Sequence, residues 1–166
     1  KVYEEGYKWA EKYDEELKKL LDNKDYSMKV IGIERGNAKP RKDIAKWSDL
    51  KDNIIYMYEE PTEFDLDKIT GEDAKKVITE YMKVYDENVD KQAWFDTMKD
   101  VAENCGYARE VKEFKAEPEK WPGHVGDVST VIRVVLTGRR NTPDLYEIMK
   151  VLGKDEVMKR FNNFLK

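Results

Sequence analysis

Three arginines lie close together around a predicted turn in the C-terminal third of the chain. Arg133 lies in an apolar segment, and Arg139 and Arg140 follow the end of that segment. Thr142 and Pro143 then precede a second helical segment, whose unpaired main-chain N–H groups and partial positive charge favour anions. Guanidinium groups beside such a helix terminus suit a negatively charged, planar partner such as RNA. A well-capped helical hairpin with solvated arginines explains the same spacing, so both interpretations stay open.

A second basic cluster contains Lys39, Arg41 and Lys42. Gly36 and Pro40 predict a loop there, and loops make contacts with partners more often than the interiors of helices do. Closely spaced cations suit a phosphate backbone, for which charge rather than side-chain identity supplies the affinity. The alternative is a solvated loop that nearby acidic residues balance.

Two helices and a tight turn are predicted to position the three arginines. The first helix has a stripe of apolar residues at helical spacing, although its β-branched content is also compatible with a strand. The stripe consists of Val128, Val131, Ile132, Val135 and Leu136. Asp127 is expected to cap this helix and Gly138 to end it. Thr142 is expected to be the N-cap of a second helix over 144–152, with Pro143 as its first residue.

Helical spacing of apolar residues continues through most of the chain, which predicts an all-α fold. Helices are expected over 2–21, 26–35, 48–58, 71–85, 91–105, 107–114 and 155–166. Thr70 and Asp90 are expected to be N-caps. An acidic stretch, 59–70, predicts a connection between two small helical subdomains, 1–66 and 67–166. No calcium-loop spacing is present in it, so a solvated linker is favoured over a metal site.

Composition places limits on the function. The chain has 166 residues, a net charge of −4 and one cysteine, Cys105. This balance excludes a polybasic protein but allows a local basic face. An internal disulfide is impossible, and a single cysteine suits the reducing cytoplasm. No apolar run is long enough for a membrane span. We expect a cytoplasmic monomer without a membrane partner, and the helical pattern already present at Lys1 leads us to expect a piece of a longer protein.

Three stretches of the sequence resemble one known family. STVIRVVLTGRRNTPDLYEIMKVLGKDEVMKRF is similar to the C-terminal anticodon-binding domain of bacterial-type glutamyl-tRNA synthetases. The family pattern there is L/I-R-x-A/V-L-T-G, a turn with T/S-P, and L-x-E-I/L-M-x-x-L-G before a basic amphipathic helix. IERGNAKPRKDIAKWSDL and WFDTMKDVAENCGY resemble the same family. The passage 115–124 is longer than the family leads one to expect.

The resemblance implies an all-helical cage that binds the anticodon loop of tRNA. It places Arg133, Thr142, Pro143 and Leu145 at positions that contact anticodon nucleotides. Unstacked bases need fork-shaped donors and apolar surfaces, which these side chains supply. The resemblance also favours RNA-backbone contacts for the remaining basic residues, which are Arg139, Arg140, Lys39, Arg41 and Lys42. The partner would be a glutamate tRNA, with a glutamine tRNA left open.

Arginine 133 needs a partner because the other face of its helix is predicted core. A carboxylate within the protein would make Arg133 structural, and a base or phosphate outside it would make Arg133 part of the binding site. The resemblance favours a base.

The sequence does not contain the residues of a catalytic site. The family's synthetases activate glutamate with ATP and magnesium through an H-x-G-H signature and a K-M-S-K-S loop, and this chain has one histidine, His124, and no such loop. A lone histidine without nearby cysteine or histidine partners does not make a zinc site. We therefore expect no catalytic residue, metal or cofactor in this chain. A helical protein–protein interaction module without RNA affinity is the alternative function.

Overall fold

The computed structural model describes residues 1–34 and 46–166, and these residues form helices and no strand. The all-α prediction is therefore confirmed for the described part of the chain. The chain forms two compact units, 1–60 with 143–152 and 61–142 with 153–166. The predicted subdomains 1–66 and 67–166 differ from these units chiefly because residues 143–152 group with the N-terminal part of the chain. No described helix is long and apolar enough to cross a membrane.

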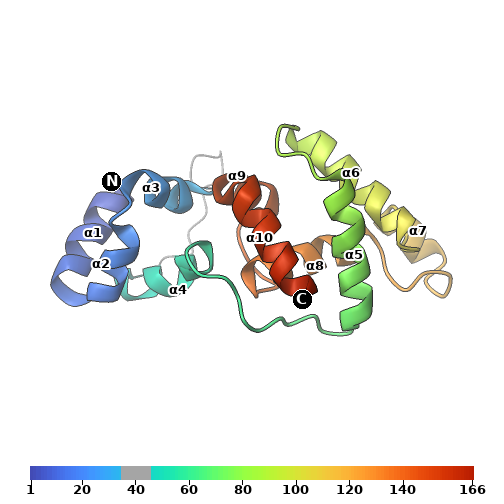
Figure 1. Ribbon diagram of the computed structural model, residues 1–166, viewed down its shortest axis with the longest axis horizontal. Coiled ribbons are helices and arrows are strands. Elements are labelled where there is room, and N and C mark those ends of the chain that lie inside the picture. The colour runs from blue at the N-terminus through green and yellow to red at the C-terminus, as the bar shows by residue number, and fades with distance from the viewer. Residues whose placement is uncertain (35–45) are drawn as a thin grey trace. The chain divides into compact units, whose positions relative to one another are not determined.

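The first unit consists of short helices (Figure 1). They are α1 (Val2–Tyr13), α2 (Glu15–Leu21), α3 (Lys24–Gly32), η1 (Trp47–Asp49), α4 (Leu50–Ile54), η2 (Ile55–Met57) and α9 (Leu145–Leu152). The predicted single helix over 2–21 is wrong, because Asp14 interrupts it. Asp14 has extended backbone, and its carboxylate accepts a hydrogen bond from the Leu17 N–H at 3.1 Å, which starts a new helix. The predicted helix over 48–58 likewise consists of short α and 3-10 turns.

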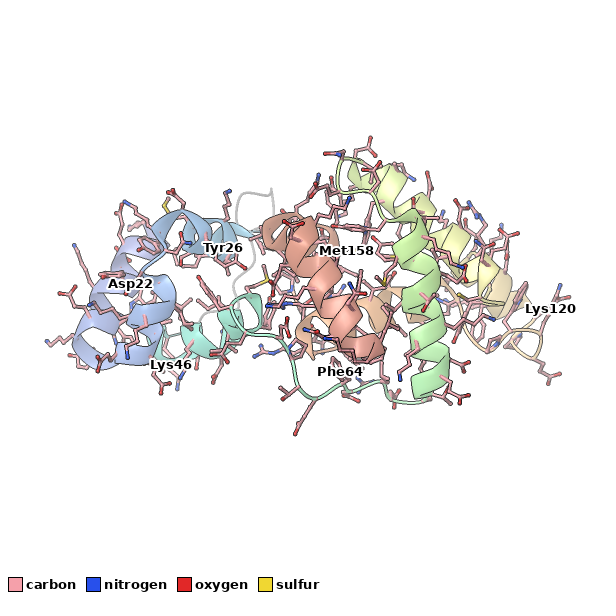
Figure 2. The ribbon with its side chains drawn as sticks, viewed as in Figure 1. Asp22, Tyr26, Lys46, Phe64, Lys120 and Met158 are labelled. Carbon is pink, nitrogen blue, oxygen red and sulfur yellow. The ribbon has the colours of Figure 1, made fainter. Side chains whose placement is uncertain are left out.

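Hydrogen bonds from aromatic hydroxyls connect the helices of this first unit. The Tyr3 hydroxyl donates to the main-chain oxygen of Leu21 at 2.7 Å. The Tyr26 hydroxyl donates to the main-chain oxygen of Met57, and the Tyr26 ring packs edge-on against Tyr58 (Figure 2). Helix α9 contacts α3, which explains its place in this unit, and it has a buried apolar face. That face consists of Leu145, Ile148, Met149 and Leu152.

The second unit has a core of four helices that contact one another (Figure 1). They are α5 (Gly71–Val84), α6 (Lys91–Asn104), α8 (Val125–Thr137) and α10 (Lys154–Leu165), and the short α7 (Val111–Ala116) lies between α6 and α8 in the chain. The predicted caps of α5 and α6 are confirmed, since Thr70 and Asp90 accept hydrogen bonds from the N–H groups of Asp73 and Ala93. The predicted stripe of α8 is buried throughout.

Most of the acidic connection, residues 61–70, belongs to the second unit and packs within it instead of being only a solvated linker. Phe64 lies against Phe164 near the end of α10, with the ring centroids 5.0 Å apart (Figure 2). Pro61 and the main-chain oxygen of Glu63 lie beside Gly138 at the end of α8. The segment thereby reaches the turn that carries Arg139 and Arg140.

Candidate nucleic-acid interface

Helix α8, which carries Arg133, starts three residues before the predicted position. Its N-cap is His124 and not Asp127. The Nδ1 atom of His124 accepts from the Gly126 N–H at 2.9 Å, and the Asp127 carboxylate accepts from the His124 N–H at 2.9 Å. These two bonds make a reciprocal capping box that satisfies two N–H groups of the first turn. The single histidine of the sequence, His124, therefore has a structural function in this chain.

The predicted end of α8 at Gly138 is confirmed. Gly138 has φ 74°, a left-handed conformation that glycine adopts without a steric penalty. The buried hydroxyl of Thr137 donates to the main-chain oxygen of Arg133 at 2.7 Å and accepts from the Arg139 N–H at 3.1 Å. The Thr-Gly pair thus fixes the direction in which the chain leaves α8 and the place where Arg139 begins.

A buried arginine on α10 also stabilises the end of α8. Arg160 is 2% exposed, and it donates to the main-chain oxygen of Leu136 at 2.7 Å and to the Glu156 carboxylate at 2.9 Å. The carbonyl groups of a final helical turn have no partner inside the helix, and the helix dipole favours a cation there. A basic residue on an amphipathic helix is ordinarily expected on its outer face, and Arg160 is buried instead. Its spacing from Glu156, four residues, was the available signal of a pair.

Arg133 bonds back to the turn that follows its own helix. Its guanidinium group donates to both the side-chain hydroxyl and the main-chain oxygen of Thr142, the latter at 3.1 Å. The sequence predicts a protein carboxylate, a base or a phosphate as the partner of Arg133. The partner in the structure is instead a threonine of the same predicted site. Arg133 is half-buried. The contact brings two of the predicted anticodon-binding residues together and connects the two ends of the turn.

The second helix of the predicted hairpin is capped by a different residue. Helix α9 begins at Leu145, and the Asp144 carboxylate accepts a hydrogen bond from the Glu147 N–H at 3.1 Å. The prediction of Thr142 as N-cap and Pro143 as first helical residue is therefore wrong. Aspartate is at least as good an N-cap as threonine, and Asp-x-x-Glu has the spacing of a capping box. Thr142 is thereby left to bond with Arg133.

The four predicted anticodon-contact residues belong to different compact units. Arg133 and Thr142 lie in the second unit, whereas Pro143 and Leu145 lie in the first. Leu145 is 2% exposed in the first turn of α9, and Pro143 is buried as well. Direct base contact by these two residues stays a prediction.

Arg140 is the exposed cation of the turn. Its Nε atom lies 3.1 Å from the Asp65 carboxylate, and one of its terminal nitrogens lies 3.3 Å from that of Asp67. These two carboxylates belong to the acidic connection, for which no such contact was predicted. Arg139 is half-buried beside Thr137. The predicted backbone contacts at Lys39, Arg41 and Lys42 lie outside the described residues.

Three tyrosines in the second unit, Tyr81, Tyr85 and Tyr107, have raised pKa values because burial keeps their hydroxyls from water. Burial raises the pKa of Tyr81, and burial with the nearby Glu87 and Asp86 raises that of Tyr85 to about 12. Tyr81 is buried in the core and lies edge-on to Phe161 at 5.8 Å, whereas Tyr85 is half-buried at the end of α5. Within residues 1–34 and 46–166, no group of three histidine, cysteine, aspartate or glutamate side chains could hold a metal ion.

Comparisons with known proteins match almost the whole chain, including the turn that follows α8. The model of the family described as the anticodon binding domain matches residues 8–165. A glutamate–tRNA ligase of Clostridium perfringens is 41% identical over 172 residues, covering 99% of this chain and 31% of the relative. A glutamate–tRNA ligase of Sorangium cellulosum is 39% identical over 170 residues, covering 99% of this chain and 30% of the relative. The chain thus spans less than a third of the length of these relatives, and no solved structure matches it.

Proposed function

Because the chain belongs to the anticodon-binding domain family, we propose that it binds tRNA and recognises anticodon bases at the turn that follows α8. The observation that supports this most directly is the hydrogen bonding between Arg133 and Thr142. These bonds hold the fork-shaped guanidinium group of Arg133 beside the main-chain oxygen of Thr142, in a stretch of α8 that is otherwise apolar from Val131 to Leu136. A preformed arrangement of this kind loses less conformational entropy on binding than a flexible one.

The roles of the residues divide by chemistry. Arg133, Thr142, Pro143 and Leu145 are proposed to contact anticodon bases, since single-stranded loops expose base edges and faces to such side chains. Arg139 and Arg140 are proposed to contact phosphates, whose binding depends on charge. Lys39, Arg41 and Lys42 are proposed as further backbone contacts on the strength of the sequence alone.

The wider assignment rests on the names of the relatives. We propose that the protein to which this chain corresponds attaches glutamate to tRNA with ATP and magnesium, as a cytoplasmic enzyme. The tRNA would be the glutamate acceptor, with the glutamine acceptor as a second candidate. This chain itself would bind tRNA as a monomer and contribute no catalytic residue, metal or cofactor.

A gel-shift titration with a glutamate tRNA transcript tests the proposal. Binding should weaken as salt concentration rises, because cations that contact phosphates release counterions from the RNA. A missing shift at low salt would contradict the proposal. The chain alone should show no glutamate-dependent exchange of pyrophosphate into ATP, and measurable exchange would contradict the assignment of catalysis to the rest of the protein.

A further inference from the structure

We propose that Asp65 and Asp67 compete with RNA phosphates for Arg140, and so limit the sequence-independent part of tRNA binding at this turn. This inference rests on the proposed function and adds to it a limit on the strength of phosphate binding. Both carboxylates lie within ion-pair distance of the Arg140 guanidinium, at 3.1 and 3.3 Å. The pair occupies the same donors that a phosphate would require.

Contacts other than the ion pairs hold the main chain near the two carboxylates, and main-chain hydrogen bonds from Leu66 to Phe64 and from Ile69 to Leu66 shape the turn that carries Asp67. A Cβ atom on Gly138 would lie 2.9 Å from Pro61 and 3.2 Å from the main-chain oxygen of Glu63, so the acidic segment lies directly against the end of α8. Phe64, next to Asp65, packs on Phe164. The carboxylates therefore stay near Arg140 when the ion pair itself opens.

Because the three side chains are exposed, a phosphate can displace the carboxylates from Arg140, and the ion pairs contribute little to the stability of the fold. The side chains of Arg140, Asp65 and Asp67 are 49%, 61% and 59% exposed. Ion pairs at such exposure add little to folding, because water screens them and ordering the side chains opposes them. A phosphate can replace the carboxylates at Arg140 without breaking any buried contact. Two negative charges remain beside the bound RNA and oppose it.

Phosphate contacts are the same for every RNA sequence, so this competition acts on all RNAs alike. The expected result of removing the two charges is tighter binding of tRNA whatever its anticodon. The ratio of affinities between anticodon variants should stay unchanged. In the native protein, the carboxylates would keep binding to unrelated RNA weak.

The test is the double variant Asp65→Asn with Asp67→Asn, for which tRNA affinity is measured over a range of salt concentrations. Asparagine has nearly the shape of aspartate and removes its charge. It also tolerates the φ of 54° at Asp67. We expect affinity to rise about two- to tenfold, the range that corresponds to the loss of one or two exposed ion pairs. The salt slope should steepen by about one unit, because Arg140 then displaces one more counterion.

Two controls separate this mechanism from a general charge effect. Glu113→Gln with Glu119→Gln makes the same change of net charge at exposed sites of the same unit, and it should raise affinity much less. Arg140→Ala should abolish the gain that Asp65→Asn with Asp67→Asn produces. A gain that persists without Arg140, or that the control variant matches, would overturn the inference. So would unchanged affinity in the asparagine variant while the unaltered protein still binds tRNA. If the unaltered protein does not bind tRNA at all, the proposed function fails first.

Discussion

Arg160 on α10 donates a hydrogen bond to the main-chain oxygen of Leu136 on α8, across 24 residues of sequence and at 2.7 Å. The bond places a buried guanidinium group on the last turn of the helix that carries Arg133. The end of α8, and with it the turn at Thr137-Gly138, is therefore set by tertiary packing as well as by local sequence.

Replacement of Arg160 should destabilise the second unit. Arg160→Met leaves the Leu136 carbonyl without its donor and removes the ion pair with Glu156, which should lower the free energy of unfolding by roughly 2–4 kcal/mol. Urea denaturation measures the change. Lys159→Met on the exposed neighbour is the control and should change it by less than about 0.5 kcal/mol. Equal effects of the two replacements would show that Arg160 does not support α8.

Gly138→Ala should be more harmful than an alanine at another left-handed glycine. Gly106 has φ 82° with nothing near its hypothetical Cβ, so Gly106→Ala should cost about 1–2 kcal/mol from backbone strain alone. At Gly138 the added methyl group also meets the Pro61 ring and the Glu63 main chain, which should add about 1–3 kcal/mol. Thermal or urea denaturation of the two variants compares them. Similar losses would mean that the segment near Pro61 moves aside easily.

Arg133 and Thr142 should act as a coupled pair in tRNA binding. Arg133→Ala should reduce stability by about 1 kcal/mol through the lost hydrogen bonds and tRNA affinity by roughly 1–3 kcal/mol. Thr142→Val removes the hydroxyl acceptor at similar size. A double-mutant cycle on tRNA dissociation constants should give a coupling energy of about 0.5–1.5 kcal/mol, because each replacement disturbs the same contact. Strict additivity would contradict the idea that Thr142 positions Arg133. A large loss of stability without any loss of anticodon preference would make Arg133 purely structural.

Alkaline pH should destabilise the second unit. The pKa of Tyr85 is raised to about 12 and that of Tyr81 is also raised, so the folded state favours their neutral forms relative to the unfolded chain, where tyrosine has a pKa near 10. Stability from this source is complete below about pH 10 and is lost as pH rises toward 12. Urea midpoints measured across this range should fall, and Tyr85→Phe should reduce the fall. Midpoints that stay constant up to about pH 12 would contradict the raised values.

Local patterns in the sequence predicted the class of fold and many helix ends. The stripe of α8 and the caps Thr70, Asp90 and Gly138 follow from helical periodicity and capping preferences, which depend on nearby residues. The break at Asp14 was missed because the apolar spacing continues across it. Asp144 was missed as N-cap because Thr142-Pro143 offered a competing start two residues earlier, although Asp144 and Glu147 have capping-box spacing.

The supports of the candidate site were beyond sequence reasoning because they join residues far apart in the chain. Nothing near Arg160 in sequence indicates Leu136 as its acceptor, and nothing near Arg140 indicates Asp65 or Asp67. A charged residue on an amphipathic helix is usually solvated, so burial of Arg160 opposes the ordinary expectation. By contrast, the family resemblance pointed to Arg133 and Thr142 as parts of one site, and the structure brings these two residues into contact.

The central claim, that this chain recognises the anticodon of a tRNA, is tested most directly by two dissociation constants measured at one salt concentration. One is for a glutamate tRNA transcript, and the other is for the same transcript with its anticodon bases replaced. If bases are recognised, the replacement should weaken binding about ten- to a hundredfold, since each base contact contributes on the order of 1–3 kcal/mol. Equal constants for the two transcripts would contradict the claim and leave only electrostatic RNA binding.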